Sequence, residues 1–185
     1  MLKNQEHVAW LHPHFSTKCQ TDVEEMTRMD VAGREKAVRT WEMLRDRAPG
    51  FENSYIALTC PQLGTTGGRR LVGEYVLSTA DLHRTEPFED TVAIFPNTSD
   101  TEYTKFYVPY RSLIPKEIDG LMVACRAFST DDPINNRFNL VPHCICLGQA
   151  AGTAAAIAAK ENVKVRDVPY APLKESLLKQ GVILP

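Results

Sequence analysis

The stretch LMVACRAFSTDDPINNRFNLVPHCICLGQAAGTAAAIAAK, residues 121–160, decides the fold. It opens on a short, continuously apolar run at 121–125, which is typical of a strand covered on both faces in a parallel sheet. Pro142 suits the first turn of a helix, because proline has no backbone N–H to lose there. The small and apolar residues that follow extend this helix to Lys160. The pattern predicts a strand–loop–helix unit in a mixed α/β fold.

Small residues recur along one side of this expected helix. Gly148, Gly152 and Ala156 stand at four-residue spacing and therefore form a ridge on one face. Such a ridge lets the helix axis lie close to a sheet, a ligand or another helix. Tight packing without any ligand is the alternative interpretation.

The start of the helix is a candidate binding element. A helix N-terminus offers unpaired N–H groups and partial positive charge. The residues Leu140-Val141-Pro142-His143 are apolar enough to predict a position inside the protein, so these donors need a partner. A flavin is one candidate, since its pyrimidine edge gathers negative charge on reduction. Capping by the Asn139 side chain is an equally good explanation.

The same stretch is long enough to cross a bilayer. Residues 138–159 contain no Asp, Glu, Lys or Arg. Polar residues nevertheless interrupt them, and the mean hydropathy of the chain is −0.26. We expect a helix buried inside a soluble protein and no membrane contact.

The rest of the chain reads as helix, then short strands, then a final helix. A long helix is expected from Thr21, where Thr21-x-x-Glu24 has the form of a capping box, to Pro49-Gly50. Its inner face holds Met26, Asp30, Gly33, Ala37, Trp41, Leu44 and Ala48. Strands are expected at 55–60, 70–78, 91–95 and 105–110, and an amphipathic helix at 172–180 with Leu173 and Leu177 inward. We divide the chain into an irregular segment (1–20), a helix with a small β-sheet (21–120) and the returning strand, helix and tail (121–185).

Composition excludes several classes of function. The 185 residues include 21 Lys and Arg against 23 Asp and Glu, a net charge of −2, so bulk charge cannot drive nucleic-acid binding. Five cysteines and no leader-like opening predict a reducing, cytoplasmic setting, with most cysteines acting as small buried hydrophobes. The pair His12-x-His14 has no further ligand cluster at a metal-binding spacing, so no metal is expected.

Several ordered motifs resemble the FAD-dependent oxidoreductase family, whose relatives include fumarate-reductase-type and glucose-inhibited-division-type flavoproteins. They are YRSLIPK (110–116), DGLMVACR (119–126), Arg137 and GQAAGTAAA (148–156). Upstream, PGFE (49–52), PQLG (61–64) and RRLVGEY (69–75) through Asp81 also match. The resemblance spans the chain from about Thr21 to its end, and the order and spacing of the pieces carry it.

The resemblance implies a fold divided between FAD-binding and substrate-side regions. The strand 121–125 would return to the flavin-binding sheet, with Cys125 and Arg126 near the dinucleotide. Val141, Pro142 and His143 would bring backbone donors to the pyrimidine edge of the flavin, where the helix dipole stabilises the reduced form. Gly148, at the start of the small-residue motif, would also lie on the cofactor side.

The resemblance also implies a substrate side that contains Tyr110, Arg111 and Arg137. Two other interpretations stay open. Arg111 could simply brace the end of a strand, and Arg137 could pair with Asp131 or Asp132.

Two departures from the family pattern weaken the expected cofactor site. Cys125 stands where the family usually has glycine, and its side chain would crowd a backbone position close to the cofactor. The turn around Thr66 also lacks an arginine that the family leads us to expect.

No Gly-x-Gly-x-x-Gly occurs among the ten glycines, so the fingerprint that brings a helix N-terminus to the pyrophosphate is missing. We expect the C-terminal portion or small subunit of an FAD-dependent oxidoreductase that acts on a small organic substrate. It would lack the N-terminal Rossmann half, share FAD with a partner chain or a missing N-terminal half, and be inactive alone. The alternative is a non-catalytic remnant or interaction module, and it predicts exposed apolar surface.

Overall fold

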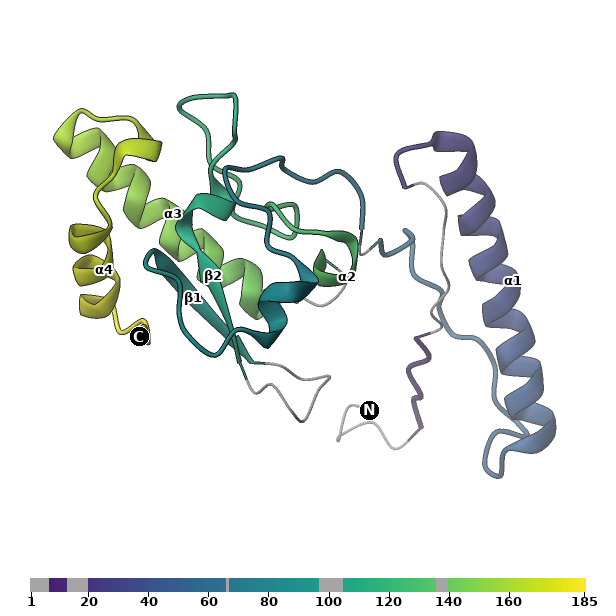
Figure 1. Cartoon of the computed structure of the whole chain (residues 1–185). Coiled ribbons are helices and arrows are strands. Elements are labelled where there is room, and N and C mark those ends of the chain that lie inside the picture. Colours follow the sequence, from purple (N-terminus) through teal and green to yellow (C-terminus); the bar gives the residue numbers. More distant parts are fainter. Residues whose placement is uncertain (1–6, 13–19, 66, 97–104, 136–139) are drawn as a thin grey trace. The chain divides into compact units, whose positions relative to one another are not determined.

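A computed structural model describes residues 7–12, 20–65, 67–96, 105–135 and 140–185 (Figure 1). The chain divides into two compact units, Met1–Thr65 and Thr66–Pro185. The region at 21–120, which the sequence suggested as one part, therefore extends over both units. Each unit is described here by itself.

The smaller unit is built on helix α1, Val23–Arg47. Its N-cap is Asp22, whose carboxylate accepts hydrogen bonds from the backbone N–H of Glu24 (2.9 Å) and of Glu25 (3.3 Å). The expected capping box on Thr21 is therefore wrong by one residue: the aspartate occupies the cap and satisfies two N–H groups at once. The helix ends at Arg47, ahead of Pro49, and Gly50 takes a positive φ of 90°.

One side of α1 rests on the segment that follows it. The predicted inner face is confirmed, because all seven of its residues are half-buried while the charged residues opposite are mostly exposed. The Trp41 indole N–H donates to the Ser54 carbonyl (3.3 Å) and lies 3.2 Å from the Ser54 hydroxyl. Arg34 donates to the Thr59 hydroxyl at 3.0 Å. Residues 55–60 were expected as a strand and do not form one; the hydrogen bond from Arg34 to Thr59 connects this segment to α1.

The larger unit contains a two-stranded antiparallel sheet of β1 (Thr91–Pro96) and β2 (Lys105–Pro109). Ile94 pairs with Tyr107, and a register shift lies between Thr91 and Ala93. Val92 and Val108 are fully buried. Both strands confirm the sequence prediction for 91–95 and 105–110.

Two further expected strands do not form in the larger unit. At 70–78 the chain makes only single bridges, Gly73 with Pro115 and Leu77 with Thr130. Residues 121–124 are extended but belong to no sheet, and a lone backbone bond joins Val123 N–H to the Leu113 carbonyl at 2.9 Å. A strand needs a neighbouring strand that takes its hydrogen bonds in series, and the described part of the larger unit places no strand beside 121–124.

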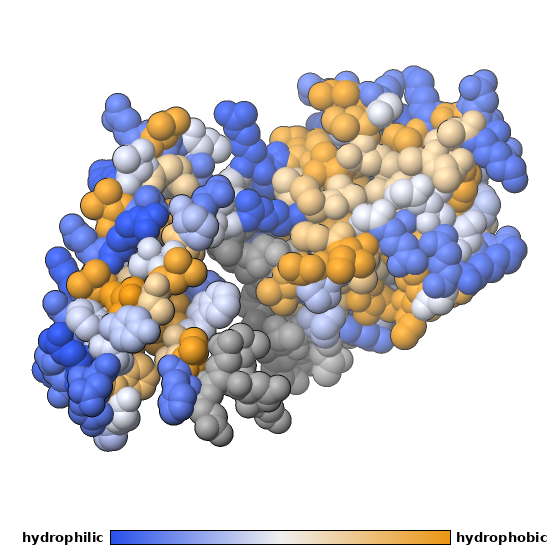
Figure 2. All heavy atoms as spheres, turned by 180° about the vertical axis from the view of Figure 1, so that it is seen from behind, coloured by the Kyte–Doolittle hydropathy of each residue, from blue (hydrophilic) through white to orange (hydrophobic). Residues whose placement is uncertain are grey.

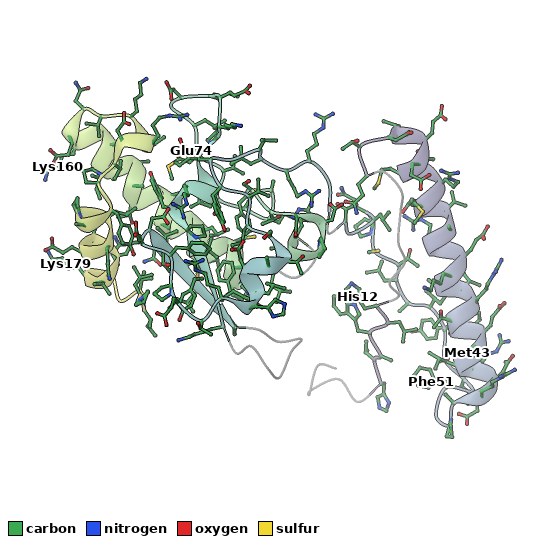
Figure 3. All side chains as sticks on the ribbon, viewed as in Figure 1. His12, Met43, Phe51, Glu74, Lys160 and Lys179 are labelled. Carbon is green, nitrogen blue, oxygen red and sulfur yellow. The ribbon has the colours of Figure 1, made fainter. Side chains whose placement is uncertain are left out.

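Side chains tie these extended segments together. Arg166, in the short helix η3 (Val165–Asp167), pairs with Glu74 at 2.6 Å and with Asp119 at 2.5 Å. The same guanidinium donates to the carbonyls of Pro115 (3.0 Å) and Ile118 (3.2 Å). Glu74 is labelled in Figure 3 beside these loops. Three separate stretches of chain are thus fixed by one arginine.

Helix α3, Val141–Glu161, is the main helix of the larger unit. It begins one residue before the expected Pro142 and ends at Glu161, one residue after the expected Lys160. Its C-cap is Asn162, which has left-handed backbone angles (φ 53°). Its buried face packs on β1 and on helix α4, Tyr170–Lys179. That face consists of His143, Leu147, Ala150, Ala151, Ala154 and Ala158.

The end of the chain confirms its prediction. Leu173 and Leu177 of α4 are fully buried in the same core. Gly181 follows the helix with a φ of 84°, a conformation that glycine adopts without strain. Three short helices complete the unit: η1 (Thr79–His83), η2 (Tyr110–Leu113) and α2 (Asp132–Asn135).

By length and composition, α3 would be able to span a membrane, a test that the core helices of soluble proteins also pass. We expected it to be buried inside the protein. Only 28% of its apolar window is buried, because the chain covers one side of the helix.

Two glycines allow a matched test of this packing. A Cβ on Gly73 would lie 2.7 Å from the Cβ of buried Ser129, so Gly73→Ala is expected to lower the free energy of unfolding by about 1–3 kcal/mol. A Cβ on Gly148 meets nothing within 4 Å, so Gly148→Ala is expected to raise it by roughly 0.5–1 kcal/mol. Urea unfolding followed by far-UV circular dichroism measures both. Effects of equal sign would contradict this packing.

Candidate functional site

The first turn of α3 is exposed at the surface of the larger unit. Val141 is 72% exposed and Leu140 47% exposed, so the expectation of a buried helix start is wrong for this chain by itself. The N-cap residue is Leu140, and no side chain caps the helix. Asn139, the alternative cap, lies outside the described residues. Pro142 has no N–H, so Val141 and His143 carry the first amide donors of the turn.

The imidazole of His143 points into the core. It is 4% exposed and stacks on the Phe95 ring of β1, with centroids 4.2 Å apart and planes 23° from parallel. The stack fixes the rotation of the first turn about the helix axis. The His143 side chain is therefore not available on the exposed side of the turn.

The side of α3 opposite its buried residues is apolar as well. We define this outer face as the exposed residues Val141, Ile145, Gly148, Gly152, Ala155 and Ala159. Their three- and four-residue spacing places them on one side of the helix. Ile145 is 64% exposed, and the face contains no charged residue. Figure 2 shows apolar side chains at the surface of this unit, in the right-hand body.

The two glycines of the outer face serve no contact among the described residues. A Cβ built on Gly148 or on Gly152 meets nothing within 4 Å. Tight packing inside the chain, one interpretation of the ridge, is therefore wrong for these two positions. The alternative of close approach to another body stays a prediction.

Cys125 and Arg126 lie in an exposed turn after the extended segment 121–124. The Cys125 sulfur accepts a hydrogen bond from the Ala127 N–H at 3.4 Å, and its carbonyl accepts one from Phe128 N–H at 3.0 Å. The Arg126 carbonyl accepts from the Asn135 side-chain amide at 2.6 Å. The turn is thus fixed by its own hydrogen bonds, with the Cys125 side chain at the surface.

Tyr110 is built into the core. It is 6% exposed, and its hydroxyl donates to the Val165 carbonyl at 2.6 Å. Burial, with a smaller contribution from Glu74, raises the pKa of this phenol well above its ordinary value. This placement favours a structural role, in which Tyr110 connects η2 to η3, over contact with substrate.

Arg111 has one polar and two aromatic neighbours. Its backbone N–H donates to an Asp90 carboxylate oxygen at 3.1 Å, and its Nε lies 3.9 Å from the same oxygen. Its guanidinium carbon lies 4.9 Å from the Tyr75 ring centroid and 5.8 Å from that of Phe88. The backbone hydrogen bond supports the bracing interpretation, whereas Nε makes no hydrogen bond among the described residues and only this long ion-pair contact with Asp90. The Arg111 side chain is 43% exposed.

Arg137 lies outside the described residues. The two aspartates proposed as its partners have others. Asp131 accepts from the Thr79 backbone (2.8 Å) and from Ile134 N–H (3.0 Å), and Asp132 pairs with Arg70.

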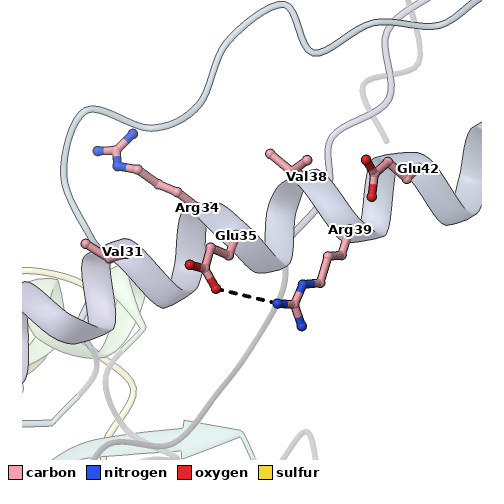
Figure 4. Close-up of a pocket in the computed structure, with 6 residues that line it drawn as sticks. All are labelled: Val31, Arg34, Glu35, Val38, Arg39 and Glu42. Carbon is pink, nitrogen blue, oxygen red and sulfur yellow. Dashed lines mark ion pairs between the residues drawn. The ribbon is translucent and has the colours of Figure 1, made fainter.

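The remaining candidate features give less support for a functional site. No group of three metal-ligating side chains occurs in the described ranges, and His14 falls outside them. Cys60 and Cys125 are exposed, so the expectation of buried cysteines is wrong for these two, whereas Cys144 is half-buried and Cys146 is half-buried against the core. A shallow groove runs along α1, lined by Val31, Arg34, Glu35, Val38, Arg39 and Glu42 (Figure 4). Residues of a single helix line it, so it encloses nothing.

Sequence reasoning missed the surroundings of Arg111. Tyr75 donates to an Asp81 carboxylate oxygen at 2.7 Å, and Asp81 also accepts from the Ser78 N–H at 2.8 Å as part of a capping box. The Ser78-x-x-Asp81 spacing was the available signal. No sequence signal was available for the stacking of Arg111 on the aromatic rings, because this contact joins residues far apart in the chain.

The alkaline ionisation of Tyr75 tests this cluster. Burial, followed by the hydrogen bond and charge of Asp81, raises the pKa of Tyr75 from 10.0 to about 12. The neutral Tyr75 phenol therefore makes its full contribution to the free energy of unfolding below pH 10. That contribution is lost as the pH rises towards about 12 and the phenol ionises. In Asp81→Asn we expect a lower Tyr75 pKa that stays above 10.0, because burial is the largest cause. The phenolate absorbance difference between each protein and its Tyr75→Phe variant measures it, and an unshifted Tyr75 would contradict the geometry.

The comparison with family models explains the motifs. No curated protein and no solved structure matches the chain. The family model described as FAD dependent oxidoreductase matches residues 2–177, nearly the whole sequence. The cofactor that this family implies is FAD. The chain belongs to the FAD-dependent oxidoreductase family.

Proposed function

We propose that this chain supplies the flavin-facing and substrate-side portion of an FAD-dependent oxidoreductase. A partner chain or an N-terminal half supplies the site for the FAD pyrophosphate. The substrate is a small organic molecule and the setting the cytoplasm, with neither nucleic acid nor membrane as a partner. The proposal refines a general oxidoreductase function that the family supports.

The outer face of α3 carries the proposal. A helix that is apolar all round is normally covered all round, yet this chain covers only the side that faces β1 and α4. Glycines at 148 and 152 leave room for another backbone to approach closely. Exposed Leu121, at 44%, adds to the same kind of surface. A nucleotide-binding half would cover this surface.

The residues present fit one end of FAD. The first turn of α3 is exposed, has no side-chain cap and carries the positive end of a 21-residue helix. It thus suits the pyrimidine edge of the flavin, with the backbone N–H groups of Val141 and His143 as donors. When bound, the flavin exchanges two electrons with an organic substrate.

The residues present do not fit the other end of FAD. No Gly-x-Gly-x-x-Gly occurs in the sequence, and the extended segment 121–124 has no sheet to join among the described residues. The Cys125 side chain also stands at the turn where the family has glycine. These features support dependence on a second half for FAD binding.

The exposed apolar surface favours a second candidate function equally well. A protein-interaction module without catalysis would also present an uncovered face like that of α3. The colour of the assembled complex separates the two candidates, because only the oxidoreductase portion holds flavin.

Enlarging the outer face is expected to block assembly. The chain is coexpressed with the reading frame or upstream segment that carries the Gly-x-Gly-x-x-Gly fingerprint, and flavin absorbance and co-elution are measured. Gly152→Leu places a large side chain where the second half approaches, so the yellow complex is expected to be lost. Hydrophobic-dye binding by the chain alone is expected to fall on assembly of the unaltered protein.

The matched control is Lys160→Leu, on the same helix. Lys160 projects outward at the end of α3 (Figure 3), and the same added leucine there is expected to leave assembly intact. A colourless complex from the unaltered chain would favour the interaction module. A yellow complex that tolerates Gly152→Leu would contradict the role of the outer face.

Flavin fragments test the division of the cofactor site. The chain alone is expected to bind FAD and riboflavin weakly and to a similar extent, because the pyrophosphate finds no site on it. Flavin fluorescence titrations of both ligands measure this. If the chain alone bound FAD more than about tenfold (1.4 kcal/mol) tighter than riboflavin, dependence on a second half would be wrong.

A further inference from the structure

The guanidinium groups of two arginines lie close to the ring of Phe88. The guanidinium carbon of Arg84 lies 4.2 Å from the ring centroid, and that of Arg111 lies 5.8 Å from it. The separation of the two carbons therefore cannot exceed the sum of these distances. Phe88 is only 5% exposed and packs edge-on against Tyr75, with centroids 5.3 Å apart. A buried aromatic pair thus has two cations stacked near it.

The hydrogen-bonding edges of these cations are available. Among the described residues, no acceptor bonds to the Arg84 guanidinium or to the terminal nitrogens of Arg111. Stacking on a ring occupies the flat face of a guanidinium and leaves its N–H fork free. Arg84 is exposed and the Arg111 side chain is 43% exposed, so both forks reach solvent.

The nearby carboxylates accept hydrogen bonds from groups other than the two guanidinium groups. Asp81 accepts from the Tyr75 hydroxyl and from Ser78. Asp90 accepts from the Arg111 backbone and lies 3.9 Å from Arg111 Nε. Glu86 and Glu89 are exposed and form no ion pair with either arginine. Asp90 offsets part of the positive charge of Arg111. The positive charge of Arg84 has no carboxylate partner among the described residues.

We propose that Arg84 and Arg111 form a binding site for a small oxyanion, the carboxylate or phosphate group of an organic ligand. A planar fork of N–H donors matches either group in bidentate geometry, and two forks beside one ring give one ligand two such contacts. That this ligand is the substrate of the oxidoreductase rests on the proposed function. Binding of the anion itself does not, because these two arginines need no flavin.

The test is calorimetric titration of the full chain, without FAD, with succinate, inorganic phosphate and uncharged succinamide. We expect succinate or phosphate to bind and succinamide not to bind. Arg84→Gln and Arg111→Gln are each expected to weaken anion binding about tenfold, since each removes one charge-assisted pair. Arg84→Lys keeps the charge without the fork, so its loss is expected to be smaller.

The matched control is Arg69→Gln, an exposed arginine of the same unit without an aromatic stack, and its binding is expected to be unchanged. Succinate alone would identify a carboxylate site, phosphate alone a phosphate site, and both a shared one. Absence of anion binding, or binding that survives both glutamine variants, would overturn the site. Because the exposed head of Arg84 contributes little to folding, Arg84→Gln stays informative even if Arg111→Gln unfolds. A missing yellow complex with intact anion binding would instead count against the proposed function.

Discussion

The apolar surface on both sides of α3 is the constraint from which the rest of the larger unit follows. The inner side is satisfied: His143 stacks on Phe95, and Ala150 and Ala154 are fully buried against the sheet and α4. The outer side is exposed along the length of the helix. Burying apolar area stabilises by roughly 25 cal/mol per Å², so a second body that covers this side would gain substantially. The chain belongs to the FAD-dependent oxidoreductase family, and we propose a nucleotide-binding half as this second body.

The missing strand at 121–125 has the same physical origin. A continuously apolar run forms a strand only beside neighbours that take its hydrogen bonds, and here Val123 makes one bond, to Leu113. The first turn of α3 is likewise exposed, although its apolar sequence is typical of an interior position. Both features are what we expect under the proposed function, in which a second half covers these elements. Tyr110 and Phe88 differ from these elements, because both are packed within the unit itself.

Local patterns were read correctly where local forces decide. The period of α1, the strands β1 and β2, and inward Leu173 and Leu177 all follow from residue spacing. The N-cap of α1 is Asp22 and not the predicted Thr21, because two neighbouring residues with capping side chains compete for this position. The predictions of strands at 55–60, 70–78 and 121–125 were wrong, since strand pairing depends on segments far away in the sequence.

In the candidate site, residue spacing identified α3 and its ridge of small residues. The stacking of Arg84 and Arg111 on Phe88 could not be predicted, because it joins segments that only folding brings together.

Thiol labelling at a single outer-face position tests the central claim most directly. Ala155→Cys places a thiol on the exposed side of α3, and Lys160→Cys places one beyond it on the same helix. Peptide mapping separates both from the native exposed Cys60 and Cys125. If a second half covers the outer face, position 155 reacts readily in the chain alone and is strongly protected in the flavin-loaded assembly, whereas position 160 reacts in both. Equal reactivity of position 155 in the two states would contradict this account.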